Sequence, residues 1–117
     1  MPTFRIRSIS PKESAWSDVV AENDALAAQW WHEKHGQYGL DVVLHSDDGP
    51  SVSFVKVEVE GNGTMVSRLY RSGIRRRGGV KPRNPMTVEK VAKILSYEGD
   101  PKELLAAGWE AESDAWE

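Results

Sequence analysis

The sequence predicts a small α+β domain in which a mainly antiparallel sheet of about four strands packs on one long N-terminal helix. Two short helices are expected near the C-terminus. Strict apolar alternation at 52–60 and helical spacing of apolar residues at 10–35 and 88–95 support this fold class. With 117 residues, the chain is long enough for one core and too short for two. We therefore expect one domain over 1–108, followed by an acidic tail at 109–117.

Composition excludes several classes of protein. The chain has no cysteine, which removes disulfides, thiolate zinc sites and cysteine nucleophiles. There is no run of 18 apolar residues that could span a membrane. The N-terminus also lacks the apolar segment of a signal peptide. These features predict a cytoplasmic protein without a membrane partner.

The first third of the chain predicts a strand and a helix. Phe4 and Ile6 alternate with Arg5 and Arg7, as in a short strand. Ser10-Pro11-Lys12-Glu13 has the residue types that begin a helix. Apolar residues then occupy one helical face as far as His35, with Gly36 at the end. They are Ala15, Trp16, Val19, Val20, Leu26, Ala27, Trp30 and Trp31.

Asn23 is a polar residue in the middle of this apolar face, and it leaves a second interpretation open. In that alternative, a strand covers 16–21, and Asn23 or Asp24 caps a shorter helix that ends at His35. We favour the single long helix because its start signal at Ser10 is stronger.

The middle of the chain predicts three further strands. Leu40, Val42 and Leu44 alternate up to His45, and the Asp47-Asp48-Gly49-Pro50 turn follows. The clearest strand is 52–60, where valine alternates with charged residues. Another strand is expected at 65–71, after Gly61-Asn62-Gly63.

A three-residue Gly-Asn-Gly loop fixes the predicted register of this hairpin. It pairs Val59 with Met65, Val57 with Ser67, and Val55 with Leu69, and the long helix is expected to cover this face. On the other face it sets Phe54 opposite Tyr70 and Lys56 opposite Arg68. A two-residue loop would instead place Arg68 among the valines.

Two short helices are predicted after the hairpin. Val88, Val91, Ala92 and Leu95 have helical spacing. Asp100-Pro101-Lys102-Glu103 repeats the residue types of a helix start and predicts a second helix over 104–107.

Charge is strongly segregated in this sequence. The 28 residues from Gly61 to Val88 contain no acid and seven of the fifteen basic residues, whereas the segment 98–117 has a formal charge of −6. A loop rich in glycine and arginine is predicted at 72–85 inside the basic segment. Such neighbouring charges of opposite sign shape the local field and the choice of partner.

The basic segment predicts a non-enzymatic binding module that contacts nucleic-acid phosphates, because guanidinium groups bind phosphate in a bidentate manner. Two aromatic residues flanked by cations would add a surface for stacking bases. Alternatively, the C-terminal helices cover the aromatic pair as a second core layer. The candidate binding residues are Phe54, Lys56, Arg68, Tyr70, Arg71, Arg75, Arg76, Arg77, Lys81 and Arg83.

A second hypothesis is a protein-binding inhibitor or adaptor, such as one encoded by a phage or mobile element. The basic loop would then meet an acidic surface of the partner, or the tail with Trp109 and Trp116 would meet a basic one. The basic loop could also fold back on the acidic tail and mask it.

A metal-dependent enzyme is the weakest hypothesis. His32 and His35 share one side of a helix, and with His45 and the Asp47-Asp48 turn they could gather a metal ion. Solvated histidines at the polar edge of a helix are the alternative. No nucleophile motif or phosphate-binding loop is present. We therefore expect no catalytic residue, metal or cofactor.

Overall fold

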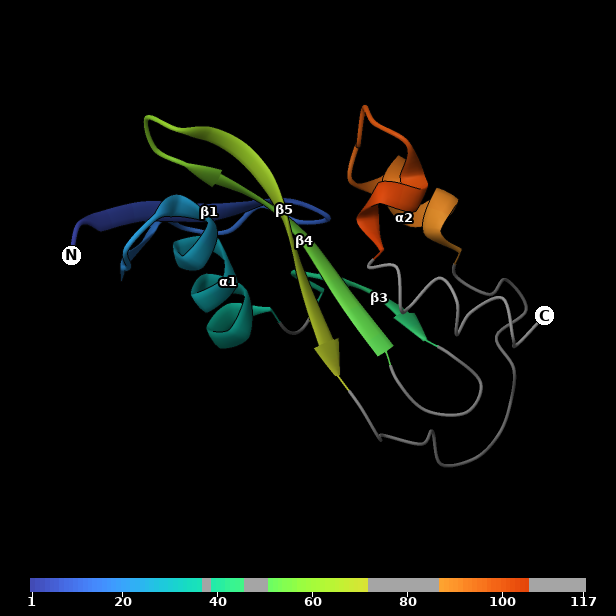
Figure 1. The fold of residues 1–117 in the computed structure, drawn as a ribbon, viewed down its shortest axis with the longest axis horizontal. Coiled ribbons are helices and arrows are strands. Elements are labelled where there is room, and N and C mark those ends of the chain that lie inside the picture. The colour runs from blue at the N-terminus through green and yellow to red at the C-terminus, as the bar shows by residue number, and fades with distance from the viewer. Residues whose placement is uncertain (37–38, 46–50, 72–86, 106–117) are drawn as a thin grey trace.

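The computed structural model describes residues 1–36, 39–45, 51–71 and 87–105, and these residues form five strands, two α-helices and a 3₁₀-helix (Figure 1). All strand pairs are antiparallel and belong to one sheet, so the predicted α+β class is confirmed. The strands are β1 (Thr3–Ser10), β2 (Ser17–Val20), β3 (Val42–His45), β4 (Ser51–Val59) and β5 (Gly63–Arg71). The helices are α1 (Asp24–His35), α2 (Val88–Ile94) and the 3₁₀-helix η1 (Pro101–Leu104).

The strand β4 is the centre of the sheet and pairs with three other strands. Along one edge it pairs with β5 from Ser51 to Val59. On its other edge, β3 pairs with residues 51–54 and β1 with residues 56–59. The strands β1 and β3 therefore lie end to end beside β4, and β2 extends the sheet beyond β1.

The prediction of a single long N-terminal helix is wrong, and the alternative prediction of a strand followed by a shorter helix is confirmed. Residues Ser17–Val20 form β2, and α1 has only 12 residues. Asn23 is the N-cap of α1, with an extended backbone and a side chain that accepts a hydrogen bond from the Leu26 amide at 2.9 Å. The polar residue that interrupted the apolar face is therefore the residue that begins the helix.

Ser10 does not cap a helix, because it belongs to β1 and its side chain has another partner. The Ser10 hydroxyl donates to the carbonyl of Ile94 at 2.8 Å and links β1 to the end of α2. The following loop returns onto β1 through hydrogen bonds to Ser8, whose hydroxyl donates to the Lys12 carbonyl at 2.6 Å. The Ser14 amide donates to the Ser8 carbonyl, and the Ser8 amide donates to the Ser14 hydroxyl.

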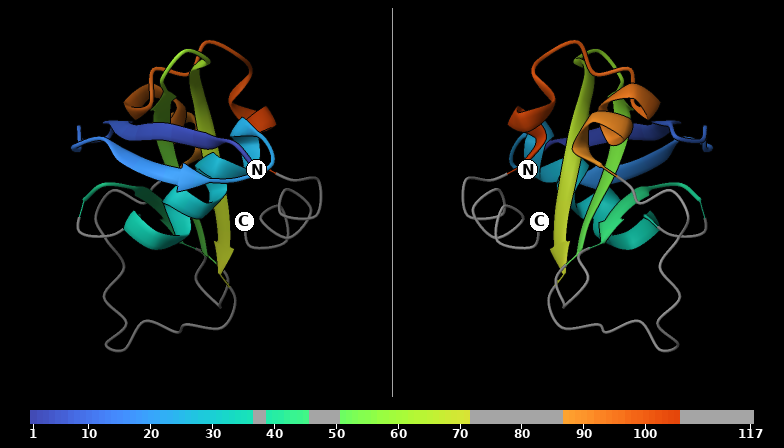
Figure 2. Two further views of the ribbon diagram at one scale, coloured as in Figure 1. Left: turned by 90° about the vertical axis from the view of Figure 1, so that its left-hand side faces the viewer. Right: turned by 90° about the vertical axis from the view of Figure 1, so that its right-hand side faces the viewer.

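Helices cover both faces of β4 and create two apolar clusters (Figures 1 and 2). On one face, α1 contributes Trp31 to a cluster with Ile6, Val55, Val57 and Val59, as the valine pattern predicts. On the opposite face, α2 and η1 cover Phe54 and Val52. Because β4 is covered on both sides where α2 reaches it, Val52, Ser53, Phe54 and Val55 are buried in succession.

The β4–β5 hairpin has its side chains on the predicted faces, but its register differs by two residues. Val59 pairs with Gly63, Val57 with Met65, and Val55 with Ser67. The turn uses Glu60-Gly61-Asn62, one residue earlier than expected, and the Asn62 amide donates to the Val59 carbonyl at 2.9 Å. Gly61 has φ +82° and supplies the left-handed conformation that this turn requires. An even shift leaves every side chain on its original face.

The first of the two short C-terminal helices is confirmed as α2. The helix predicted over 104–107 is not confirmed, because Leu105 has an extended backbone and residues 106 and 107 lie outside the described residues. Thr87 caps α2 by accepting from the Lys90 amide at 3.2 Å. Asp100 accepts from the Lys102 amide at 3.0 Å, so η1 begins at Pro101 rather than at 104. Within the four described ranges, no helix is long and apolar enough to cross a membrane.

We predict that Ser96→Gly stabilises the protein. Ser96 follows α2 with φ 52°, and the next amide, that of Tyr97, donates to the Ala92 carbonyl at 2.9 Å. A left-handed backbone costs a residue with a Cβ roughly 1 kcal/mol, and glycine removes this cost. Urea denaturation should show a gain of about 1 kcal/mol for Ser96→Gly and no gain for the control Ser96→Ala. A glycine variant no more stable than the wild type would contradict this prediction.

Candidate binding surface

The structure describes only part of the predicted binding surface. The side chains of Phe54, Lys56, Arg68 and Tyr70 are described, and the backbone of Arg71 ends β5 opposite Ser51. Several other predictions fall outside the described residues. They are Arg75, Arg76, Arg77, Lys81 and Arg83, the loop 72–85, the tail 109–117, and the Asp47-Asp48 turn.

Phe54 and Tyr70 do not form the predicted pair of stacking aromatics. In the observed register Phe54 is opposite Arg68, and Tyr70 is opposite Val52. Phe54 has no exposed surface because it packs in the cluster under α2, whereas 44% of Tyr70 is exposed. The alternative of a core layer beneath the C-terminal helices is therefore correct for Phe54. A base-stacking role needs an exposed ring, so Phe54 is excluded from it.

The side chain of Arg68 supports η1. Its Nη1 donates to the carbonyl of Leu104 at 3.0 Å and to that of Glu103 at 3.3 Å. These carbonyls lie at the end of η1, where a cation also interacts favourably with the backbone dipoles. Arg68 thus links η1 to β5 through hydrogen bonds.

Lys56 lies far from the place where the loop 72–85 leaves the sheet. It is half-buried on β4, opposite Val66, and five residues from Ser51. Since Ser51 pairs with Arg71, and a strand rises about 3.3 Å per residue, roughly 17 Å separates Lys56 from that end of the sheet. Lys56 is therefore nearer to Arg68, which lies two residues along β5 from its partner Val66, than to Arg71.

His32 is fully buried, contrary to the expectation of a solvated residue at the edge of a helix. Its Nε2 lies 2.8 Å from the Ser53 hydroxyl, and its Nδ1 lies 3.0 Å from the Ser67 hydroxyl. Ser53 in turn donates to the carboxylate of Asp41. This polar network connects α1, β4, β5 and the segment that leads into β3.

The direction of the Ser53 hydrogen bond places a proton on one nitrogen of the His32 ring. Ser53 has one hydroxyl proton and donates it to Asp41, so its oxygen must accept the bond from Nε2. Nε2 therefore carries a proton, and Nδ1 forms its hydrogen bond with the Ser67 hydroxyl. Gly36 leaves room for this ring, since a Cβ there would lie 2.5 Å from Cδ2 of His32.

Neither described histidine side chain forms part of a metal site in the structure. Both ring nitrogens of His32 are used by serines. His35 lies with its ring centre 5.2 Å from that of Trp31, and partial burial, with a smaller effect of Lys34, lowers the pKa of His35 below its usual value. In the part of the chain that the structure describes, no three His, Asp or Glu side chains gather around a common point.

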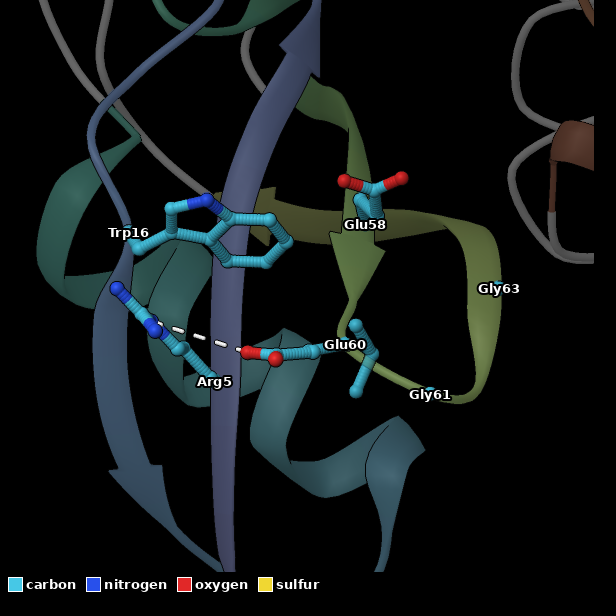
Figure 3. Close-up of a pocket in the computed structure, with 7 residues that line it drawn as sticks. Arg5, Trp16, Glu58, Glu60, Gly61 and Gly63 are labelled. Atoms are coloured by element: carbon cyan, nitrogen blue, oxygen red, sulfur yellow. Dashed lines mark ion pairs between the residues drawn. The ribbon is translucent and has the colours of Figure 1, made fainter.

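A pocket lies at the turn end of the β4–β5 hairpin, opposite the end that contains Arg71. The sequence did not predict this pocket. Its volume is about 320 Å³, and Trp16, Arg5, the β4 residues around Glu58, and the glycines of the turn line it. Figure 3 shows the indole of Trp16 lying across β1 and facing Glu58 and the turn. The guanidinium carbons of Arg5 and Arg7 lie 5.6 Å and 4.8 Å from the centre of this indole.

The sequence predicted one feature of the pocket, the outward orientation of Arg5 and Arg7. The alternation of Phe4 and Ile6 with Arg5 and Arg7 sets both arginines on the outer face of β1, as observed. Trp16 was instead assigned to the buried face of a long helix. Because no helix exists there, Trp16 occupies the loop before β2 and reaches the outer face of the sheet.

Comparison with known proteins finds no family model, curated protein or solved structure that matches the chain. Function must therefore be inferred from the residues themselves.

We predict that Ser53→Ala destabilises the protein by about 1–3 kcal/mol, because it leaves both Nε2 of His32 and a carboxylate oxygen of Asp41 without this hydroxyl. Ser67→Ala removes one hydrogen bond and should cost less. Urea denaturation measures both changes against Ser17→Ala, a half-buried serine of β2 outside the network. Equal losses in Ser53→Ala and Ser17→Ala would show that the network contributes nothing to stability.

Proposed function

We propose that the protein is a small non-enzymatic binding module that contacts nucleic-acid phosphates through its basic segment. The observation that carries this proposal is the run from Gly61 to Val88, with seven basic residues and no acid. A cationic segment of this kind attracts phosphates at long range and binds them by releasing counterions. Arginine, which makes up six of the seven, suits bidentate phosphate contacts.

The fold supports a division of roles within the basic segment. Its first part is β5, which is fixed to β4 along nine residue pairs and provides a rigid base. Arg68 is occupied at η1, so we assign it to holding this base together. The phosphate contacts are assigned to the basic residues that follow it, namely Arg71, Arg75, Arg76, Arg77, Lys81 and Arg83.

Tyr70 is the described aromatic residue that fits a stacking role. It is exposed and lies one residue before Arg71, where a base on its ring would have cations near its phosphates. Stacking on an aromatic ring is tolerant of base identity and requires an unpaired base. We therefore propose that single strands bind more tightly than duplexes.

The first test is fluorescence anisotropy with labelled single- and double-stranded DNA and RNA across a salt series. We expect log–log slopes of about −0.7 to −0.9 per phosphate contact. Replacing Arg75, Arg76 and Arg77 with alanine should weaken binding and make the slope shallower, because phosphate contacts are lost.

The matched control removes the same charge from elsewhere on the surface. Lys12, Lys34 and Lys90 are exposed, and replacing all three with alanine also lowers the net charge by three. This variant should largely retain the affinity and slope of the wild type. Absence of binding at low salt, or equal losses in both triple variants, would contradict the proposal. A pull-down for a protein partner would then test the inhibitor or adaptor hypothesis.

We predict that Tyr70→Ala selectively weakens single-strand binding. Loss of a stacked base costs about 1–3 kcal/mol, which corresponds to at least a fivefold weaker single-strand affinity, while duplex affinity should change little. The control is Trp30→Ala, which removes another aromatic ring of which 43% is exposed, on α1. If single-strand affinity is unchanged in Tyr70→Ala, the stacking role is wrong, although the phosphate contacts could still be tested separately.

A further inference from the structure

We propose that the pocket beside Trp16 binds a cationic side chain, an arginine or lysine of a basic peptide. This site is separate from the proposed nucleic-acid surface. The pocket adjoins the turn before Gly63, whereas the proposed phosphate-binding residues begin at Arg71, where β5 ends. Nine residues of β5 separate these two points, a distance of about 26 Å at 3.3 Å per residue.

The aromatic wall of the pocket has an affinity for cations. An indole face attracts a guanidinium or ammonium group through its quadrupole, most strongly among the aromatic side chains. The protein already uses this attraction, since the guanidiniums of both Arg5 and Arg7 lie within 6 Å of the Trp16 ring centre. Trp16 itself is only partly buried, so the ring is not enclosed by the fold.

Two carboxylates give the pocket its second binding element. Glu58 is on β4 and Glu60 is the first residue of the turn, where its amide donates to the Arg5 carbonyl at 2.9 Å, and both residues line the pocket. A guanidinium has five N–H donors and can reach acceptors on both sides. The residues that line the pocket include these two carboxylates and one cation, Arg5. This excess of negative charge favours a cation over a phosphate.

The two ion pairs at the pocket differ in strength, and a ligand can replace the cation of the weaker pair. Arg7 Nε donates to Glu58 at 3.0 Å, and both side chains are about one-third exposed. Arg5 Nε lies 3.8 Å from Glu60, and both side chains are more than half exposed. Exposed pairs at such a distance contribute little, so an incoming cation can take Glu60 while Arg7 and Glu58 hold the indole in place.

The turn keeps one side of the pocket clear for a peptide. Gly61 and Gly63 have positive φ, and no atom lies within 4 Å of the Cβ that a larger residue would carry there. A volume of about 320 Å³ is at the lower end for ligand sites and suits one long side chain rather than a large cofactor. The main chain of the peptide would then continue past the glycines.

The test uses a blocked peptide of alternating arginine and glycine and a matched peptide with glutamine in place of arginine. We expect the arginine peptide, and not the glutamine peptide, to shift the NMR signal of the Trp16 indole N–H. Comparison with Trp16→Leu assigns this signal among the five tryptophans. Binding should weaken as salt is raised, because the partners are exposed charges.

Variants of the aromatic residue and of a carboxylate of the pocket test whether the peptide binds there. Trp16→Leu should weaken the peptide affinity by about three- to thirtyfold, the range expected for a lost cation–π contact. Glu60→Gln, at a largely exposed side chain that the fold does not need, should also weaken it. The controls Trp30→Leu and Glu33→Gln change exposed residues of α1 and should retain the affinity.

Three results would overturn the proposal. The first is an unshifted Trp16 signal at millimolar arginine peptide. The second is unchanged affinity in Glu60→Gln, which would place the peptide on other acids, such as those of 98–117. The third is a Trp16 signal that responds to oligonucleotide and not to the arginine peptide. Because the arginines 75–77 are not involved, the nucleic-acid test can fail while this one succeeds, and the reverse also holds.

Discussion

Burial of β4 on both faces is the constraint on which the rest of the structure depends. A strand with both faces covered needs two separate apolar layers, and α1 supplies one while α2 and η1 supply the other. The apolar residues of the strand contribute roughly 1.5–3 kcal/mol each when fully buried. Every other strand pairs with β4 directly, except β2, which pairs through β1. The positions of the turn, the pocket and the end of β5 all follow from this one element.

The sequence was sufficient to predict β4, the α+β class and α2, because the two elements have unambiguous apolar periods. It was insufficient near Ser10 and Asn23, where two capping signals competed. Only the pairing of β2 with β1 and the bond from Ser10 to Ile94 decide between them, and both are contacts between distant segments. Local propensity does not contain that information.

The candidate sites show the same limit. The alternation in β1 correctly placed Arg5 and Arg7 on the outer face of the sheet. The indole that contacts both arginines belongs to Trp16, which lies in a loop and has no such periodic pattern. The prediction that Phe54 and Tyr70 form a pair of stacking aromatic residues was wrong for a different reason. A change of two residues in register preserves faces but exchanges partners, so Phe54 is opposite Arg68 instead of Tyr70. Independently of the register, α2 covers the face of β4 that contains Phe54. His32 was misjudged because its partners, Ser53 and Ser67, are on strands that the helical pattern could not anticipate.

The division of one edge of β4 between β1 and β3 has a consequence for local opening. The amides of β4 on that edge depend on two short strands that meet near Val55, whereas the opposite edge depends on β5 alone. Detachment of β3 would expose the apolar layer under α2, because Val42 and Leu44 belong to that layer, and would reach α1 only through Leu40 and the Asp41–Ser53–His32 network. Hydrogen exchange would then divide β4 into two cooperative units, with the boundary in the middle of a single continuous strand.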